Sequence, residues 1–438
     1  MQGPEGAARL DASATTRPSV AASPGGKHAD GNGWNVRALR KTSHGVEVLW
    51  DNEERSLFHF EWLYRNRPDV FFTCGQNMQR PTDRLKDVSS ISAALGADGE
   101  TLRMRWNDSS PESSFKLVWL RQCSYSDSWL SKLETARAPV AVKSRKSPEI
   151  SVVDYDAVMN SDEGVKLWME HVNRDGLCLL RGVPLVSGTV TRVAERIGPV
   201  MATIYGSEFD VQAVERPINV AYSKEGLDLH QDLAYYESPP ALQHLHCLRF
   251  DKGVVGGEST FTDAFHCAEL LRARDPKAFD TLCRVPATFQ KIHYDRPDPV
   301  HLSFKRPHIS VNHQGAVVSV FWAPPFEGPL QVPEDDVEEY FRAYHALAEL
   351  IEAEEQQAET RLQTRLEPGL LVTFNNRRML HGRSKFSEQS TGSRHLQGCY
   401  TSMEVYVNRL RVLQNRALEP SLRSPGIPIA RVGNQDFS

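Results

Sequence analysis

Alternating apolar and polar positions predict a β-hairpin early in the chain. Residues 46–50 alternate in this way, residues 51–54 have the composition of a turn, and residues 56–60 begin a second apolar–polar segment. We interpret residues 34–134 as a small, mostly β N-terminal domain built around this hairpin.

Helical spacing of apolar residues appears in two later segments. Residues 154–173 carry apolar side chains with helical spacing. These are Val158, Leu167, Trp168 and Val172. A second helix is expected to begin at Pro333, because proline and the acidic residues after it favour a helix N-terminus. Its apolar positions are expected to form one buried stripe: Val337, Tyr340, Phe341, Tyr344, Leu347, Leu350 and Ile351.

Short β segments fill much of the remaining chain. Residues 176–180 predict a buried strand, and residues 241–250 predict a core strand. The mixture of strands, Gly and Pro interruptions and helices predicts a mainly β fold with flanking helices. For residues 149–415 we expect a double-stranded β-helix, or jelly-roll, catalytic domain.

Three segments are expected to lie outside the two domains. Residues 1–33 are rich in small and polar residues without apolar periodicity, which is typical of a disordered leader. Residues 135–148, with Pro139 and a basic run, predict a linker. Residues 416–438 are expected to be a polar tail.

Composition narrows the class of protein. The 438 residues, 40% hydrophobic, suffice for two separate cores, and a net charge of −5 gives no overall attraction to nucleic acid or to an anionic membrane. Seven dispersed cysteines without a Cys-x-x-Cys pair favour reduced thiols in the cytoplasm. A mitochondrial presequence is a weaker alternative, because Glu5, Asp11 and Asp30 interrupt the leader. No apolar segment approaches the length of a membrane span.

The most informative chemical pattern is His230-Gln231-Asp232 with a later His381. Two imidazoles and one carboxylate can occupy one face of a ferrous ion and leave the opposite face open. His293 and Asp295 have the same spacing, but they lie in a turn-like stretch, where local hydrogen bonds are the simpler explanation. His244 and His246 form another alternating pair. We favour His230, Asp232 and His381, because a jelly-roll site takes two ligands from an early strand and one from a late strand.

Arg394 adds an anion-binding group to this set. Its planar guanidinium suits a carboxylate presented end-on, so an acidic cosubstrate is expected beside the metal.

These residues, together with residues 256–259, 374–383 and 393–396, resemble the iron(II), 2-oxoglutarate-dependent oxygenases related to taurine dioxygenase. The similarity is strongest to the γ-butyrobetaine and trimethyllysine hydroxylase branch and extends over about residues 45–415. The resemblance implies that His230, Asp232 and His381 bind Fe(II), that Arg394 and Ser259 bind the far carboxylate of 2-oxoglutarate, and that O2 is the oxidant.

The same branch carries a structural zinc in its N-terminal domain, bound by three cysteines and one histidine. This sequence departs from that pattern, because no cysteine precedes Val46 and Glu54 stands where the family histidine is expected. Cys74 and Cys123 with His44 and His59 do not supply a plausible four-ligand cluster. We therefore expect no structural zinc.

The resemblance also indicates a substrate pocket. Tyr205, Phe209, Tyr222 and Tyr400 match an aromatic cage for a trimethylammonium group, with Phe209 replacing a larger indole. Asn219 matches an amide that holds a substrate carboxylate. A second expected amide is not evident in residues 320–325, which are apolar, and its loss would weaken carboxylate binding.

We therefore predict a non-haem Fe(II)/2-oxoglutarate-dependent dioxygenase that hydroxylates, desaturates or cyclises a small amino-acid-like metabolite of specialised metabolism, with release of succinate and CO2. One alternative is a γ-butyrobetaine-type hydroxylase of carnitine synthesis. Another is a catalytically silent module that binds iron and 2-oxoglutarate. The segment 405–413 resembles one with which relatives complete a dimer, so a homodimer is expected.

Overall fold

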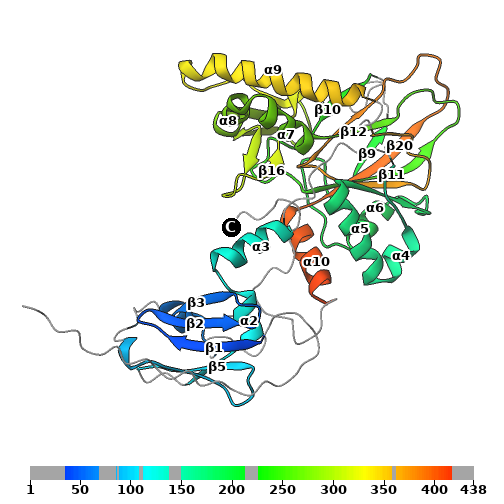
Figure 1. Cartoon of the computed structure of the whole chain (residues 1–438). Helices are drawn as coiled ribbons and strands as arrows, with labels where there is room; N and C mark the ends of the chain where they lie inside the picture. Colours follow the sequence, from blue (N-terminus) through cyan, green and yellow to red (C-terminus); the bar gives the residue numbers. More distant parts are fainter. Residues whose placement is uncertain are drawn as a thin grey trace, which may run out of the picture. The chain divides into compact units, whose positions relative to one another are not determined.

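The computed structural model describes residues 35–68, 85, 88–107, 112–137, 149–212, 225–357 and 362–416 (Figure 1). The chain divides into two compact units, one formed mainly by residues 1–136 and the other mainly by residues 137–423. The predicted leader, nearly all of the linker and nearly all of the tail lie outside the described residues, although a helix continues to Arg137 and so enters the predicted linker.

The N-terminal unit contains two antiparallel three-stranded sheets. The first has strands β1 (Val36–Lys41), β2 (Gly45–Trp50) and β3 (Arg55–His59); the second has β4 (Ser92–Leu95), β5 (Thr101–Arg105) and β6 (Ser113–Lys116). The helical segments are α1 (Phe60–Arg65), η2 (Val88–Ser90), α2 (Leu117–Gln122) and α3 (Asp127–Arg137). The β2–β3 pair confirms the predicted hairpin, and Val46, Val48 and Trp50 bury its apolar face.

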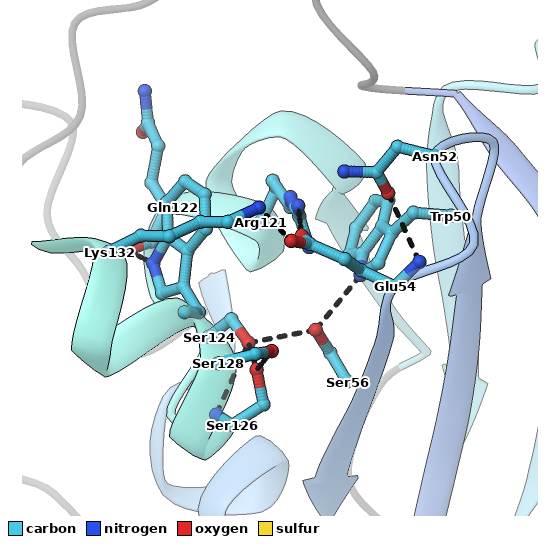
Figure 2. A network of polar contacts seen from close by, with 11 residues as sticks. Trp50, Asn52, Glu54, Ser56, Arg121, Gln122, Ser124, Ser126, Ser128 and Lys132 are labelled. Carbon is cyan, nitrogen blue, oxygen red and sulfur yellow. Dashed lines mark hydrogen bonds and ion pairs between the residues drawn. The ribbon is translucent and has the colours of Figure 1, made fainter.

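A buried ion pair ties this hairpin to the helices of the same unit (Figure 2). The Glu54 carboxylate accepts hydrogen bonds from Arg121 of α2 and from Lys132 of α3. The Arg121 side chain is only 4% exposed, and its guanidinium lies between the rings of Trp50 and Trp129, 5.0 and 4.6 Å from their centroids. Glu54 is thus held by cations from two helices.

A chain of hydroxyl groups continues from this ion pair (Figure 2). The Trp50 indole N–H donates to Ser56 Oγ over 2.8 Å, and Ser56 Oγ lies 2.8 Å from Ser124 Oγ. The buried indole N–H of Trp50 and the buried hydroxyl of Ser56 therefore both have partners.

The described residues that we considered as zinc ligands in the N-terminal unit are poorly suited to that role. Burial raises the pKa of the Cys123 thiol to about 12, whereas zinc binds the thiolate, and the His59 ring nitrogen pairs with the Tyr125 hydroxyl at 2.8 Å. Cys74 lies outside the described residues. Glu54, at the place of the family histidine, is already occupied by Arg121 and Lys132. Among the described residues of this unit, no set of zinc ligands comes together.

The second unit is built around a six-stranded and a four-stranded sheet, with strand orders β7-β8-β18-β11-β20-β9 and β10-β19-β12-β17. The strands of the first sheet are β7 (Val152–Asp154), β8 (Leu177–Arg181), β9 (Phe209–Gln212), β11 (Leu242–Phe250), β18 (Leu371–Asn375) and β20 (Arg394–Thr401). Those of the second are β10 (Leu227–His230), β12 (Ser259–Asp263), β17 (Leu362–Thr364) and β19 (Met379–Arg383). Strands far apart in the chain are neighbours in both sheets.

Two shorter hairpins complete the β structure. They are formed by β13 (Pro286–His293) with β14 (Val300–Pro307) and by β15 (Ile309–Val311) with β16 (Val317–Val320). The short helix η4 (Pro324–Phe326) follows the second hairpin.

The helices of this unit form two groups (Figure 1). One contains α7 (Ala264–Arg274), α8 (Pro276–Arg284) and α9 (Glu334–Gln356), which share a core cluster with Phe289, Val320 and Leu380. The other contains α4 (Tyr155–Asn160), α5 (Asp162–Asp175), α6 (Thr189–Ala194) and α10 (Met403–Arg416), which pack with β8, β11 and β18. This mixed, sheet-rich arrangement with flanking helices is the one that the sequence predicts.

The helix at 154–173 was predicted as one segment, and this is wrong in detail. The chain breaks at Ser161, whose hydroxyl accepts a hydrogen bond from Gly164 N and caps α5. Val158, Trp168 and Val172 are buried as expected, but Leu167 is 47% exposed. In α9, Tyr340, Leu347, Leu350 and Ile351 are buried, whereas Phe341 is 45% exposed. The predicted strands at 176–180 and 241–250 are present as β8 and β11. Within the described residues, no helix has the length and apolar character needed to cross a membrane.

Candidate active site

A pocket lies between the two main sheets of the second unit. The four-stranded sheet contributes His230, Ser259, His381 and Arg383, and the six-stranded sheet contributes Phe209, Val211, Gln243, Leu245, Arg394 and Leu396. Asp232, just after β10, also lines it. The metal-ligand and cosubstrate residues expected from the sequence therefore share one pocket, although they come from four separate stretches of chain.

The strand register brings the two histidines together. His230 ends β10 and pairs with His381 of β19, and their ring centroids are 4.4 Å apart. His230 Nε2 lies 3.5 Å from Asp232 Oδ1, and His381 Nε2 lies 3.8 Å from Asp232 Oδ2. These separations exceed those of ordinary hydrogen bonds, yet one donor atom from each of the three residues lies within 4.8 Å of the others.

The protonation of this set suits a metal. His230 Nδ1 lies 2.7 Å from the Asp228 carbonyl, which assigns the proton to Nδ1 and leaves the lone pair of Nε2 free. Burial and the neighbouring His230 lower the pKa of His381 to about 3, so its ring is neutral. Burial alone would raise the pKa of Asp232, but the two imidazoles and the Tyr400 hydroxyl hold it well below its usual range. Burial opposes protonation of His230, but the Asp232 carboxylate raises its pKa, and a bound cation would displace that proton. With both rings neutral, two imidazoles and one carboxylate fit a ferrous ion.

The segment that directly follows β10 is held in place by hydrogen bonds that involve its main chain. Asn376 Oδ1 accepts from Asp232 N at 3.0 Å, and Asn376 Nδ2 donates to Asp232 O at 2.9 Å. Gln231 N donates to Trp322 O, and Trp322 N donates to Gln231 Oε1, both at 2.9 Å. Leu233, buried and directly after Asp232, has a φ of 60°, a conformation that is rare for leucine and that the surrounding contacts must hold.

The anion-binding end of the pocket contains Arg394, Ser259 and Arg383. Arg394 Nη2 donates to Ser259 Oγ at 3.4 Å, and Arg394 Nε is buried without a hydrogen-bond partner in the described structure. Ser259 pairs with Arg383 across β12 and β19. Burial and the neighbouring Arg383 lower the pKa of Arg394 to about 10, which still leaves the guanidinium charged at neutral pH. The donors can hold a carboxylate.

The aromatic residues predicted for the substrate pocket differ in position, because one lines the pocket and two others pack against that residue. Phe209 lines the pocket and stacks on Tyr400, with ring centroids 5.0 Å apart, and Tyr205 packs behind Phe209 at 6.3 Å. Tyr400 is buried, does not line the pocket, and donates its hydroxyl to Asp232 Oδ2 at 2.8 Å. Tyr222 and Asn219 lie outside the described residues.

Among the described residues, the competing histidine pairs form no metal-type group. His244 is buried between Thr373 Oγ1 and Thr401 Oγ1, at 2.8 and 3.0 Å, and burial lowers its pKa to about 3. Burial also lowers the pKa of His246 to about 4. His293 ends β13, and neither it nor Asp295 belongs to a metal-type group among the described residues.

Two positions of the site were missed from the sequence. Gln243 lines the pocket from β11, directly opposite Tyr400 in the sheet, and its Oε1 has no hydrogen-bond partner within the described part of the chain. Gln231 holds the backbone of Trp322, whose ring stacks on Tyr344 at 4.7 Å rather than lining the pocket. Only the order of strands in space reveals either role, so no local signal in the sequence marks them.

Comparisons with known proteins agree with this geometry. The family model described as "Taurine catabolism dioxygenase TauD, TfdA family" matches residues 140–400. Gamma-butyrobetaine dioxygenase of Pseudomonas sp. (strain AK-1) is 33% identical over 373 residues, which is 84% of this chain and 94% of that protein. Dioxygenase str8 of Strobilurus tenacellus is 32% identical over 416 residues, 89% of this chain and 93% of the relative. Gamma-butyrobetaine dioxygenase of Homo sapiens is 28% identical over 378 residues, 85% and 95% of the two chains.

Proposed function

The chain belongs to the taurine catabolism dioxygenase TauD, TfdA family and is a 2-oxoglutarate-dependent dioxygenase, and from this premise we propose that it oxidises a small amino-acid-like metabolite. Its cofactor is iron(II) and its cosubstrate is 2-oxoglutarate. Membership of a family of dioxygenases argues against a catalytically silent binding module.

The site assignment rests on one observation: the proposed metal ligands and the proposed cosubstrate ligands line the same pocket. His230, Asp232 and His381 would hold the iron, because one donor atom of each lies within 4.8 Å of the others. Arg394 and Ser259 would bind the far carboxylate of 2-oxoglutarate at the other end of the same pocket. The two sheets that form its walls support the assignment of residues 149–415 as a double-stranded β-helix.

The bound groups supply the difficult chemistry: with O2, iron(II) and 2-oxoglutarate provide the oxidising power, and succinate and CO2 are released. The chain's own residues bind and orient. Asn376 fixes the backbone of Asp232 from both sides, and the Asp228 carbonyl sets the tautomer of His230. The apolar side chains of Leu245, Phe261 and Leu396 line the pocket and limit the access of water.

The substrate class rests on the walls of the pocket. Phe209 offers an aromatic face, with Tyr205 and Tyr400 packed against it, and such a face attracts an ammonium group. We assign Phe209, together with Tyr222 and Asn219, to the substrate side of the site, and we assign Tyr205 and Tyr400, which were expected there, to the support of the Phe209 ring. The apolar segment 320–325, in which Phe321 and Trp322 are buried, gives little support for a second carboxylate-binding amide. This difference favours another amino-acid-like metabolite over γ-butyrobetaine, oxidised by hydroxylation, desaturation or ring closure in specialised metabolism.

The test is succinate formation by anaerobically iron-loaded enzyme, supplied with 2-oxoglutarate and O2, against γ-butyrobetaine and a panel of amino acids. We expect an amino acid of the panel to stimulate succinate formation and γ-butyrobetaine to leave it near the uncoupled rate. Strong stimulation by γ-butyrobetaine would overturn the proposed substrate class, and no succinate under any condition would overturn the site assignment. A homodimer remains our proposal for the assembly, to be tested by the molecular mass in solution.

A further inference from the structure

Tyr400 occupies an unexpected place for a residue of a substrate cage. It lies in β20, an inner strand of the six-stranded sheet between β11 and the edge strand β9, and it is 2% exposed. Its hydroxyl donates to Asp232 Oδ2 at 2.8 Å. The polar end of this side chain is therefore directed to a metal-ligand carboxylate and not to the substrate space.

The hydrogen bond from Tyr400 fixes the orientation of the Asp232 carboxylate, which the contacts to the Asp232 main chain do not restrict. Asn376 binds Asp232 N and Asp232 O, so the main chain is held on both sides. These two contacts do not restrict rotation of the carboxylate. Apart from the two imidazoles, the hydroxyl of Tyr400 is the donor found on this carboxylate within the described structure. A hydrogen bond from a neutral phenol to a carboxylate is strong and directional, and it sets which oxygen faces the histidines.

The other end of Tyr400 reaches the aromatic wall of the pocket. Its ring stacks on Phe209 with a centroid distance of 5.0 Å and an interplanar angle of 25°. Phe209 in turn packs closely on Gly398, where an added Cβ would lie 2.5 Å from Phe209 Cζ. A glycine at 398 thus lets Phe209 sit close to the sheet and in contact with Tyr400.

From these contacts we infer that Tyr400 is a positioning residue for the metal site: its hydroxyl holds the Asp232 carboxylate, and its ring connects that carboxylate to the substrate-facing Phe209. It acts through these two residues rather than by touching substrate. The inference rests on the proposed function, because it takes Asp232 as a ligand of the iron. It predicts that a change at the aromatic wall alters the metal site, and that removal of a single hydroxyl weakens metal binding.

The test is metal affinity in the absence of turnover. Tyr400→Phe keeps the ring, the stacking and any attraction for a cation, and removes only the hydroxyl. Titration of the full chain with Mn(II) or Co(II) should give a dissociation constant about 10- to 100-fold higher than that of the unchanged protein. The Co(II) absorption spectrum should also change, because the carboxylate is no longer held in one orientation.

Tyr406→Phe is the matched control. Tyr406 is a buried tyrosine of α10, and its hydroxyl has no hydrogen-bond partner in the described part of the chain. Its loss should leave metal affinity unchanged. The unfolding midpoint of each variant, measured with and without Mn(II), checks folding and reports metal binding a second time.

The possible results distinguish the proposed metal site from the inferred role of Tyr400. If the unchanged protein binds no divalent metal, or Asp232→Ala binds it equally well, the proposed metal site is wrong. If the unchanged protein binds metal, Asp232→Ala does not, and Tyr400→Phe binds it with unchanged affinity and spectrum, the inference about Tyr400 is wrong and the proposed function stands.

Discussion

His230 and His381 face each other across two antiparallel strands, with ring centroids 4.4 Å apart, although they are distant in the sequence. The pairing of β10 with β19 places both rings in the pocket that Asp232 also lines. The proposed metal site therefore depends on strand order and not on any single loop.

His381→Ala should abolish iron-dependent turnover and weaken divalent-metal binding at least about 100-fold, because one of three protein ligands is lost. The measurement is Mn(II) titration together with succinate formation. His293→Ala is the matched control. His293 ends β13 in the competing His-x-Asp pair, and its replacement should leave metal affinity unchanged. Equal loss in the two variants would show that the ligands have been assigned wrongly.

Arg394→Ala should raise the concentration of 2-oxoglutarate needed for half-maximal succinate formation roughly 100-fold and leave Mn(II) affinity intact. The reason is that removing one partner of a buried charge pair costs about 2–5 kcal/mol. Arg249→Ala serves as the control, because Arg249 lies on the neighbouring strand β11 with its side chain 62% exposed. Normal dependence on 2-oxoglutarate in Arg394→Ala would remove this residue from the cosubstrate site.

Glu54→Gln should lower the free energy of unfolding by about 3 kcal/mol, because it leaves the buried Arg121 without its carboxylate. Glu53→Gln is the control: Glu53 pairs with Arg37 on the surface, where side chains are 70% and 58% exposed, and its loss should cost less than about 1 kcal/mol. Urea unfolding of the full chain measures both.

Treatment with a chelator distinguishes stabilisation of the N-terminal unit by this ion pair from stabilisation by a structural zinc. We predict that EDTA leaves the unfolding of the N-terminal unit unchanged, and that elemental analysis finds no tightly bound zinc. One zinc per chain, retained through dialysis against EDTA, would contradict the prediction.

Glu327 should make stability depend on pH. Burial raises the pKa of its carboxyl to about 7, with the Tyr344 hydroxyl 3.5 Å away opposing this shift, whereas the unfolded chain has an ordinary value. The folded state therefore binds the proton more tightly. The stabilisation is fully present below about pH 4.5 and is lost as the pH rises through about 7.

The comparison of Glu327→Gln with the unchanged protein tests this linkage. Glutamine resembles the protonated side chain, so the variant should gain about 2 kcal/mol relative to the unchanged protein between pH 5 and pH 8.5. Glu338→Gln, at an exposed position of α9, should show the same difference at both pH values. A flat difference for Glu327→Gln as well would mean that Glu327 titrates normally.

The sequence predicted the parts of this site that depend on residue type and order. His230, Asp232, His381 and Arg394 could be proposed from their chemistry and order, and Ser259 from the family resemblance. The hairpin and the main strands could be found from local periodicity. The hydroxyl of Tyr400 could not be assigned, because an aromatic residue in a strand has the same local pattern whether it faces substrate or a carboxylate. The break at Ser161 and the exposure of Leu167 likewise depend on how α4 and α5 pack, which periodicity does not encode.

The paired contacts between Gln231 and Trp322 have a consequence for which changes in sequence the site can tolerate. Gln231 binds the main chain of Trp322 and makes no contact there that depends on the identity of the side chain. The side chain at position 322, which does not line the pocket, can therefore change without displacing this contact. An insertion or deletion in the segment 320–325 would instead move the main chain that Gln231 binds, and so would shift the neighbouring Asp232.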